Sequence, residues 1–434
     1  MASKGIVMKK DRKEILDNYV PDVPGKFAYF LYRTALFFVN LRKKVRYIYN
    51  FDKKEMKNRQ VLILSDHNST DSYMYMSQGY GFCNPNIVMG YQNILTKGIF
   101  TLLLKIGIIP KKLYVTDMSA IKNILRLVKK GCSIALLPEG IQSSAGYSMP
   151  IYPGTAALIK RCNLDCVICK TDGSYLNRPR FDKNYRYGNI EVTFDILFTK
   201  EETQSLSEEE IDSVLKDKMA YNDFIWNKEK RYKYKGKYPN SHNIERILYH
   251  CPVCGSDFTL SSSSGKLKCT CGLECEIDEY YDLKTNTPGF PYKRIDEWFT
   301  GERNIVHIET EKDDFSMEYD CIYYDIDYVN LSGDSVKEKG RGKVILNKKA
   351  LVYNGECEGK NVEYVFDLRQ IISAPFVSGT ANEFYYNGKY YRFAPLCKES
   401  ISLKVMLAIE EIHNREDSLW RKALNDSLAE GKQV

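Results

Sequence analysis

The sequence lacks any apolar stretch long enough to form an ordinary membrane-spanning helix. Such a helix needs about 20 mostly apolar residues, whereas the most apolar stretch, residues 27–41, is shorter and is interrupted by Arg33. Histidine is also scarce, with five in 434 residues. We therefore expect no membrane span. A histidine at the end of a predicted strand becomes a candidate for acid–base chemistry, because few others can serve.

A pattern typical of a secretion signal is missing too. Thirteen cysteines without such a signal indicate a reducing, cytoplasmic setting. An apolar content of 44% and a charged content of 27% exclude a disordered chain, and the length predicts two or three domains. The net charge of +7 suits a protein that handles phosphorylated lipids or lies on an anionic membrane, although nucleic-acid-binding proteins have similar values.

Two polar turns each follow a short apolar run that is typical of a buried strand. Residues 60–64 precede Asp-His-Asn-Ser-Thr-Asp at positions 66–71, and residues 133–137 precede Pro-Glu-Gly-Ile-Gln-Ser-Ser at positions 138–144. Parallel strands of one sheet end at the same edge, where α/β proteins build their active sites. The sequence therefore predicts that these turns lie together.

These two turns resemble the signatures of the glycerophospholipid acyltransferase family, typified by 1-acylglycerol-3-phosphate acyltransferase. The family carries a His and an Asp a few residues apart and a strand that ends in Pro-Glu-Gly. The order of the other elements is also similar: a Gly-led strand with a basic end at 107–112, helices at 119–130 and 154–160, and a buried strand at 166–169. The resemblance covers roughly the first half of the chain and implies an α/β acyltransferase domain.

The resemblance implies acyl transfer from a thioester, on acyl carrier protein or coenzyme A, to the hydroxyl of a lysophosphatidic acid. An alcohol is a poor nucleophile near neutral pH, so the reaction needs a general base. We expect His67 to be that base and Asp71 to orient the imidazole and stabilise its charged form, with the substrate hydroxyl in the place of a catalytic serine. Asp66 competes as a partner, but neighbours on an extended strand point to opposite faces, which favours Asp71.

The resemblance also implies which residues bind the acceptor. Glu139 and Gly140 would place it, and Lys111 or Lys112 would contact its phosphate. Gln142 stands where relatives usually carry an Arg, so the phosphate would depend on those lysines or on Arg161.

Two departures from the family pattern keep other readings open. Only three residues separate His67 from Asp71, where the family has four; on a regular helix this change turns the carboxylate by about 100°, although a shorter turn before the helix would absorb it. Gln142 is the other departure. Alternatives are therefore an acyltransferase that acts on glycerol phosphate or another lysolipid, or a degenerate enzyme that binds lipid and scaffolds a partner. A polar helix start capped by Ser69 or Thr70 is the non-functional reading of the first turn.

Residues 27–41 form a very apolar predicted helix followed by four basic residues, Arg42, Lys43, Lys44 and Arg46. This pattern is typical of a helix that lies on an anionic membrane surface. The alternative is a helix buried against the sheet. A second apolar segment, residues 94–109, would lie on the same membrane face or line an acyl groove.

The character of the chain changes near Thr199. Acidic helices capped by Thr199 and Ser207 close the acyltransferase domain at 1–226, and a basic, Tyr-rich stretch reads as a linker at 227–247. Two cysteine pairs then define a zinc ribbon at 248–282. Its expected ligands for one structural zinc ion are Cys251, Cys254, Cys269 and Cys271. The second pair encloses one residue instead of two, so Cys275 is a possible substitute and His250 a poorly placed one. The local lysines are too few to predict nucleic acid binding.

Beyond residue 282 the sequence predicts a β-rich domain, 283–434. Its short β-type runs lie at 343–346, 350–353, 362–366, 383–386 and 390–393, and a helix follows with apolar residues at helical spacing from Ile401 to Ile412. Antiparallel strands closed by a terminal helix look like a pleckstrin-homology or GRAM-type module, with an unrelated small β domain as the alternative.

Overall fold

The computed structural model divides the chain into two compact units. It describes residues 12, 14–57, 59–96, 98–112, 117–326, 336–371, 373–377, 380–387 and 389–413. Among these, the first unit holds residues up to 179 and 186–234, and the second holds 180–185 and the described residues from 235 onward. Residues 180–185 therefore belong to the second unit, although the residues before and after them in the chain belong to the first.

The first unit is built on a seven-stranded sheet in the order β1-β8-β6-β2-β5-β3-β4. Every neighbouring pair is parallel except β6 with β8. The strands are β1 (Lys44–Tyr49), β2 (Val61–Ser65), β3 (Asn86–Gly90), β4 (Ile109–Lys111), β5 (Ile134–Leu136), β6 (Asp165–Asp172) and β8 (Asn189–Phe198); a short β7 (Arg186–Tyr187) lies outside the sheet.

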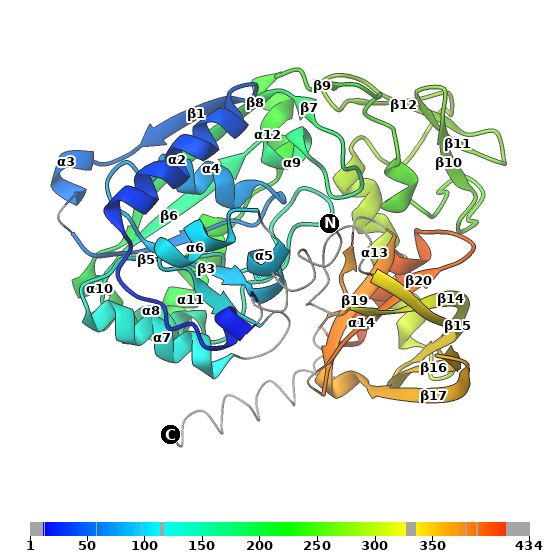
Figure 1. Cartoon of the computed structure of the whole chain (residues 1–434). Helices are drawn as coiled ribbons and strands as arrows, with labels where there is room; N and C mark the ends of the chain where they lie inside the picture. The colour runs from blue at the N-terminus through cyan, green and yellow to red at the C-terminus, as the bar shows by residue number, and fades with distance from the viewer. Residues whose placement is uncertain are drawn as a thin grey trace, which may run out of the picture. The chain divides into compact units, whose positions relative to one another are not determined.

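Helices cover both faces of this sheet (Figure 1). Along β2, Val61 and Ile63 join one core cluster and Leu62 and Leu64 the other, as the alternation of a buried strand requires. The first cluster includes residues of α2 (Lys26–Asn40), α4 (Ser72–Gly79), α5 (Tyr91–Thr96) and α6 (Phe100–Lys105); the second includes residues of α7 (Met118–Lys129), α8 (Thr155–Cys162) and α11 (Glu208–Met219). Other helices of the first unit are α3 (Lys53–Met56), α9 (Ser174–Asn177), α10 (Lys200–Ser205) and α12 (Asp223–Lys230).

The predicted strands 60–64, 133–137 and 166–169 and the helices at 119–130 and 154–160 are confirmed to within a few residues. So are the capped helices: Thr199 and Ser207 each form a capping box with a glutamate three residues later. The linker prediction is wrong at its start, because α12 continues to Lys230. The side chain of Asn222 caps the first turn of α12. Sequence reasoning missed this N-cap because the basic composition of the residues that follow suggested a linker. The apolar segment 94–109 covers the end of α5, the whole of α6 and the first residue of β4.

The second unit contains a four-stranded antiparallel ribbon and a seven-stranded antiparallel sheet. The ribbon is β10 (Leu260–Ser263), β11 (Lys266–Cys269), β12 (Glu274–Ile277) and β13 (Leu283–Thr285), after a short β9 (Lys235–Gly236) and a 3-10 turn at Ile244–Arg246. The sheet has the order β17-β16-β15-β14-β20-β19-β18. Its strands are β14 (Ser316–Ile326), β15 (Val336–Asn347), β16 (Ala350–Cys357), β17 (Lys360–Asp367), β18 (Phe376–Val377), β19 (Ala381–Tyr386) and β20 (Lys389–Pro395), with a 3-10 turn at Leu368–Gln370.

The second unit also contains the helices α13 (Ile295–Glu311) and α14 (Ile401–His413). Arg303 of α13 binds Glu410 and Glu411 of α14 at 2.6 and 2.8 Å, which joins the two helices. The predicted strands and terminal helix are confirmed, whereas α13 and β14 were not predicted. The pleckstrin-homology or GRAM-type identity stays a prediction.

Candidate active site

The two polar turns lie side by side because β2 and β5 are adjacent parallel strands. The second turn binds the backbone of His67 from two directions: the His67 N–H donates to the Glu139 carboxylate at 2.7 Å, and the His67 carbonyl accepts from the Ser143 N–H at 3.0 Å. The Thr70 hydroxyl donates to the Gln142 side-chain carbonyl at 2.9 Å. Tertiary structure therefore unites the two motifs that the sequence separates by about seventy residues.

Glu139 is buried inside this junction. Besides the His67 N–H, its carboxylate accepts from the Met149 N–H at 3.1 Å and from the Tyr221 hydroxyl at 3.2 Å. Burial, and to a lesser extent the nearby Asp66, raise the pKa of Glu139 to about 8, although the three hydrogen bonds act to lower it. These contacts give Glu139 a role in shaping the His67 turn. The predicted role in placing the acceptor stays a prediction.

Gly140 needs the conformational freedom of glycine. Its φ is 66°, in the left-handed region, and a Cβ atom there would lie 3.1 Å from the Tyr152 ring. The Lys111 ammonium lies 5.2 Å from the centre of the same ring. Tyr152 thus joins the Pro-Glu-Gly turn to the end of β4. Desolvation lowers the pKa of the half-buried Lys111, and Asp117 opposes this. Lys112 and Arg161 are exposed.

Asp71 is buried and each of its carboxylate oxygens binds a cation. Lys43 Nζ lies 2.9 Å from one oxygen, and Arg178 Nη1 lies 2.7 Å from the other. Asp71 is also the N-cap position of α4, where its carbonyl accepts from the Met74 N–H at 2.8 Å. The segment from His67 to Asp71 therefore forms the turn before α4 and is not part of the helix, and the pairing of His67 with Asp71 stays a prediction. Sequence reasoning missed Arg178 as a member of the site, because it lies 107 residues away.

The prediction that Lys43 belongs to the exposed basic flank is wrong. Lys43 was grouped with the exposed basic flank of the apolar helix, but its side chain is buried against Asp71. Arg42, Lys44 and Arg46 remain exposed.

Two other carboxylates hold the same turn: Asp66, within the turn, binds Thr171 of β6, and Asp223 of α12 binds Asn68 of the turn. Asp66 accepts from the Thr171 N–H and hydroxyl at 2.6 and 2.5 Å. Asp223 accepts from the Asn68 amide at 2.8 Å and from the Gly173 N–H at 3.0 Å. Burial raises the pKa of Asp66 to about 7 and that of Asp223 to about 8. Asp223 had no local signal in the sequence, since its partner Asn68 is 155 residues away.

These raised pKa values predict how stability depends on pH. Between the ordinary carboxyl pKa of about 4 and about 8, the native state binds more protons than the unfolded chain, so the free energy of unfolding falls as pH rises. In Glu139→Gln the amide imitates the protonated acid, and we expect a smaller fall between pH 5 and 9. Urea titrations across this range measure it. The exposed Glu201→Gln should follow the wild type; a Glu139→Gln curve parallel to the wild type would contradict the assignment.

A second candidate site is the cysteine cluster of the second unit. The sulfur atoms of Cys251, Cys254, Cys269 and Cys271 all lie within 4.8 Å of one another. Two of the separations, Cys251 to Cys271 and Cys254 to Cys269, are 3.8 Å. Four Zn–S bonds of about 2.3 Å in a tetrahedron give sulfur separations of about 3.8 Å. The predicted residues are therefore brought together, and their geometry and donor type fit a metal ion. Cys275 lies outside the cluster, and His250 binds Asp257 at 2.7 Å.

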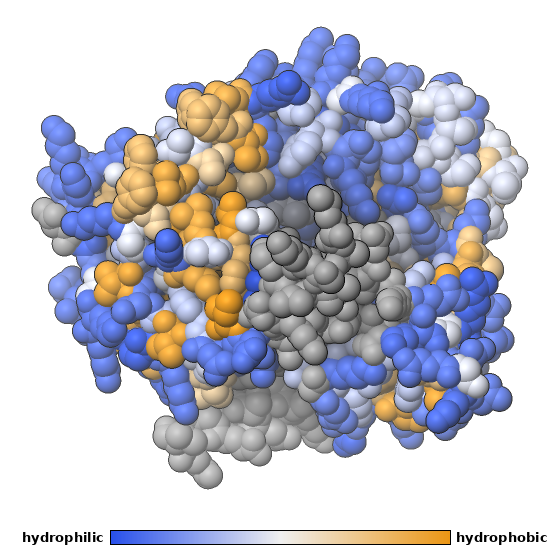
Figure 2. Space-filling view, in the orientation of Figure 1, coloured by the Kyte–Doolittle hydropathy of each residue, from blue (hydrophilic) through white to orange (hydrophobic). Residues whose placement is uncertain are grey.

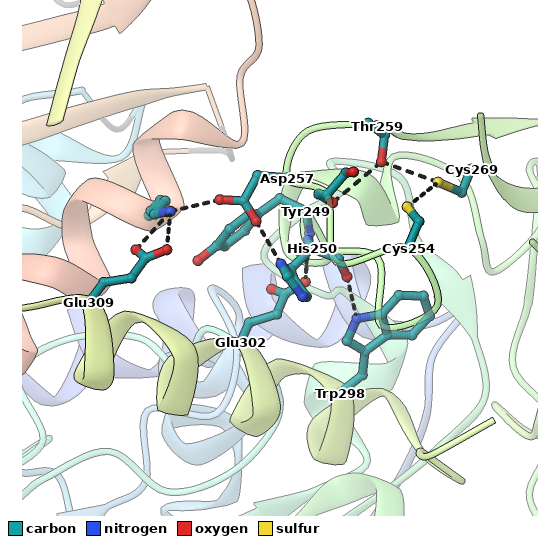
Figure 3. A network of polar contacts seen from close by, with 11 residues as sticks. Tyr249, His250, Cys254, Asp257, Thr259, Cys269, Trp298, Glu302 and Glu309 are labelled. Carbon is teal, nitrogen blue, oxygen red and sulfur yellow. Dashed lines mark hydrogen bonds and ion pairs between the residues drawn. The ribbon is translucent and has the colours of Figure 1, made fainter. Parts of the chain in front are cut away.

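Polar contacts join this cluster to the helices of the second unit (Figure 3). The buried Glu302 of α13 accepts from the backbone N–H groups of Tyr249 and His250 at 2.7 and 2.8 Å. The Trp298 indole donates to the His250 carbonyl at 2.9 Å. Asp257 also binds Lys404 of α14 at 2.7 Å. The residues that precede the first cysteine are thus part of the packing of α13 and α14.

No family model matches the chain, and no curated protein matches it. A solved structure to which it is similar is the crystal structure of the 1-acyl-sn-glycerophosphate (LPA) acyltransferase PlsC from Thermotoga maritima. The TM-score is 0.34 and the sequence identity 14%, over 50% of this chain and 84% of that chain. A similarity as low as this assigns neither a family nor an activity to the chain.

Proposed function

We propose that the first unit is an acyltransferase that moves a fatty acyl group from a thioester to the hydroxyl of a lysophosphatidic acid. One observation carries the proposal. The backbone of His67 is bound by the Glu139 carboxylate and the Ser143 N–H of the neighbouring strand end, so the two motifs of the family resemblance form one structure. A histidine held at the carboxyl edge of a parallel sheet is suited to general-base chemistry.

In the proposed reaction, His67 takes the proton of the acceptor hydroxyl while the oxygen attacks the thioester carbonyl. The new C–O bond forms, the C–S bond breaks, and the proton passes from the imidazolium to the departing thiolate. Electrons and protons balance without an acyl-enzyme. In this proposal Asp71, whose carboxylate is held by Lys43 and Arg178, is the group that stabilises the imidazolium. We propose that Lys111 binds the acceptor's phosphate, and its position beside Tyr152, which also contacts the Gly140 turn, supports this.

The two ion pairs of Asp71 favour one alternative function, that of a lipid-binding protein without enzymatic activity. A carboxylate already bound by two cations also suits a degenerate enzyme that keeps the fold and only binds lipid. Purified protein given labelled acyl-coenzyme A or acyl carrier protein, with a panel of lysophospholipids and glycerol phosphate, separates the two. Transfer identifies the enzyme and its acceptor. Lipid binding without transfer to any acceptor supports the scaffold.

The first unit presents an apolar face that suits a membrane surface. The exposed side chains of α2 include Phe27, Phe30, Phe37 and Phe38, and apolar residues gather over this helix and the neighbouring α6 (Figure 2). None of the described helices has both the length and the apolar character that crossing a bilayer requires. We propose that α2 lies on an anionic lipid surface with Arg42, Lys44 and Arg46 near the headgroups.

The protein should therefore float with anionic vesicles at low salt and detach as salt screens the basic residues. In Phe30→Ser with Phe38→Ser, which are 64% and 65% exposed, we expect vesicle binding to weaken by about tenfold or more, because each loses apolar transfer energy. Val365→Ser removes an exposed apolar side chain from the second unit and serves as the control. Absence of flotation at low salt would refute the proposal.

We further propose that the cysteine cluster holds one zinc ion. Four thiolates at tetrahedral spacing form a closed structural site. When bound, the metal would cross-link the two cysteine turns, while His67 lies in the other unit and needs no metal for proton transfer.

A further inference from the structure

The apolar helix α2 packs directly against α4, the helix that begins at the candidate active site. The Tyr32 hydroxyl donates to the Ser77 hydroxyl at 3.4 Å, and the Asn40 amide donates to the Gln78 side-chain carbonyl at 2.7 Å. Tyr32 and Asn40 are both buried. Asp71 of the candidate site is the N-cap position of α4. The helix that contacts α2 is therefore the one that directly follows the turn of the site.

Lys43 connects the last turn of α2 to Asp71 itself. Its backbone N–H donates to the Asn40 carbonyl at 2.8 Å, which ties it to the helix end. Its ammonium lies 2.9 Å from the Asp71 carboxylate and 4.9 Å from the centre of the Tyr75 ring. Lys43 is 8% exposed and Asp71 is 1% exposed. Lys43 thus contacts the site from the protein side.

The opposite face of α2 is the one offered to lipid. Phe30 and Phe38 point outward, and Arg42 and Lys44 on either side of Lys43 are exposed. Apolar side chains flanked by exposed cations are complementary to an anionic lipid surface. In the three residues 42–44, the side chains of Arg42 and Lys44 therefore face outward, toward the proposed lipid surface, and the side chain of Lys43 faces the candidate site.

We infer that Lys43 is a positioning residue through which contact of α2 with an anionic lipid surface orders the turn from His67 to Asp71. The inference rests on the proposed function for the identity of the turn as an active site. A ligand can stabilise a state only by binding it better than its alternatives. Lipid binds α2 in its folded, packed form, and in this form Lys43 reaches Asp71. Lipid thereby suppresses local openings in which α2 leaves α4.

Hydrogen exchange of backbone amides in residues 67–76 tests this without any acyl transfer. Unilamellar vesicles of phosphatidylglycerol and phosphatidylcholine are added to the full chain at about ten times the dissociation constant. If lipid binds the closed state alone, opening falls and exchange in this segment slows by about tenfold. Unchanged exchange in vesicle-bound wild type would overturn the inference, and so would failure of the wild type to bind vesicles.

Lys43→Met and Lys44→Met remove the same charge from neighbouring residues and form a matched pair. We expect Lys44→Met, saturated with vesicles, to keep the slowed exchange, and Lys43→Met to bind vesicles but lose the response. An equal response in both would overturn the inference. If thermal melting shows that Lys43→Met does not fold, Asn40→Ala replaces it, because this change removes the hydrogen bond from Asn40 to Gln78 of α4 without leaving a buried charge unpaired.

A kinetic measurement separates positioning from substrate binding. With acyl donor, acceptor and vesicles present, Lys43→Met should lower kcat by about 100-fold, the scale of a small misplacement of a catalytic group, and leave the acceptor KM unchanged. A raised KM with unchanged kcat would mean that Lys43 binds the acceptor instead. If wild type transfers no acyl group, the proposed function fails, and the exchange experiment still decides the role of Lys43.

Discussion

His67→Ala is expected to abolish acyl transfer while the protein stays folded. Losing the general base should cost more than the ~10²–10⁴-fold that is typical of an assisting acid–base group, because no other group is assigned to take the hydroxyl proton. The fold should survive because the hydrogen bonds that hold this turn, from Glu139 and Ser143, go to the backbone of His67, which alanine retains. Rates with the acceptor identified by the panel, together with circular dichroism and thermal melting, measure both parts.

The partner carboxylates provide the controls for this result. Asp71→Asn should be severe, since the amide removes the negative charge that Lys43 and Arg178 hold in place. Asp66→Asn should act mainly on stability, because Asp66 binds Thr171 of β6. If Asp66→Asn is the variant that loses turnover while remaining stable, the choice of Asp71 is wrong. Near wild-type turnover in folded His67→Ala would refute the catalytic assignment altogether.

Cys254→Ser or Cys271→Ser is expected to release the metal and unfold the ribbon. A ribbon of this size has little core of its own, and a structural zinc ion contributes on the order of 10 kcal/mol of folding free energy. The loss should extend to α13 and α14, because Glu302 and Trp298 bind the backbone just before Cys251. Elemental analysis should find one zinc per chain in the wild type and much less in either variant, with a lowered melting temperature.

Cys275→Ser is the matched control, since Cys275 is a buried cysteine outside the cluster. It should keep its zinc. Loss of zinc in Cys275→Ser but not in Cys271→Ser would show that the fourth ligand lies further along the chain. Protein purified without chelator that contains no metal would refute the site. Acyl transfer by the metal-depleted chain should persist if the first unit remains folded, because His67 belongs to that unit.

Local sequence patterns were enough to predict the elements that carry the candidate site. Four consecutive apolar residues at 61–64 indicate a strand that is buried on both faces. Thr199 and Ser207 predict the starts of their helices, because each cap and its glutamate lie within one turn. The four clustered cysteines were identified for the same reason, since each pair lies within four residues. Each of these signals involves residues that are close together along the chain, so each can be read from the sequence without the tertiary structure.

Tertiary structure alone decided which polar groups surround His67 and Asp71. Lys43, Arg178 and Asp223 contact the first turn, at Asp71 or Asn68, from 28 to 155 residues away, and nothing near each residue marks its partner. The composition of the basic flank even placed Lys43 on the surface, because a run of cations is usually solvated. A buried charge is stable only beside an opposite charge or hydrogen-bonding groups. The sequence by itself therefore determined the strands before the two turns, the helices capped by Thr199 and Ser207, and the four metal-ligand candidates. Tertiary packing brought Lys43, just after α2, and Arg178, at the end of α9, to Asp71. It thereby determined which charges are paired, because ion pairing depends on distance in space and not on separation along the chain.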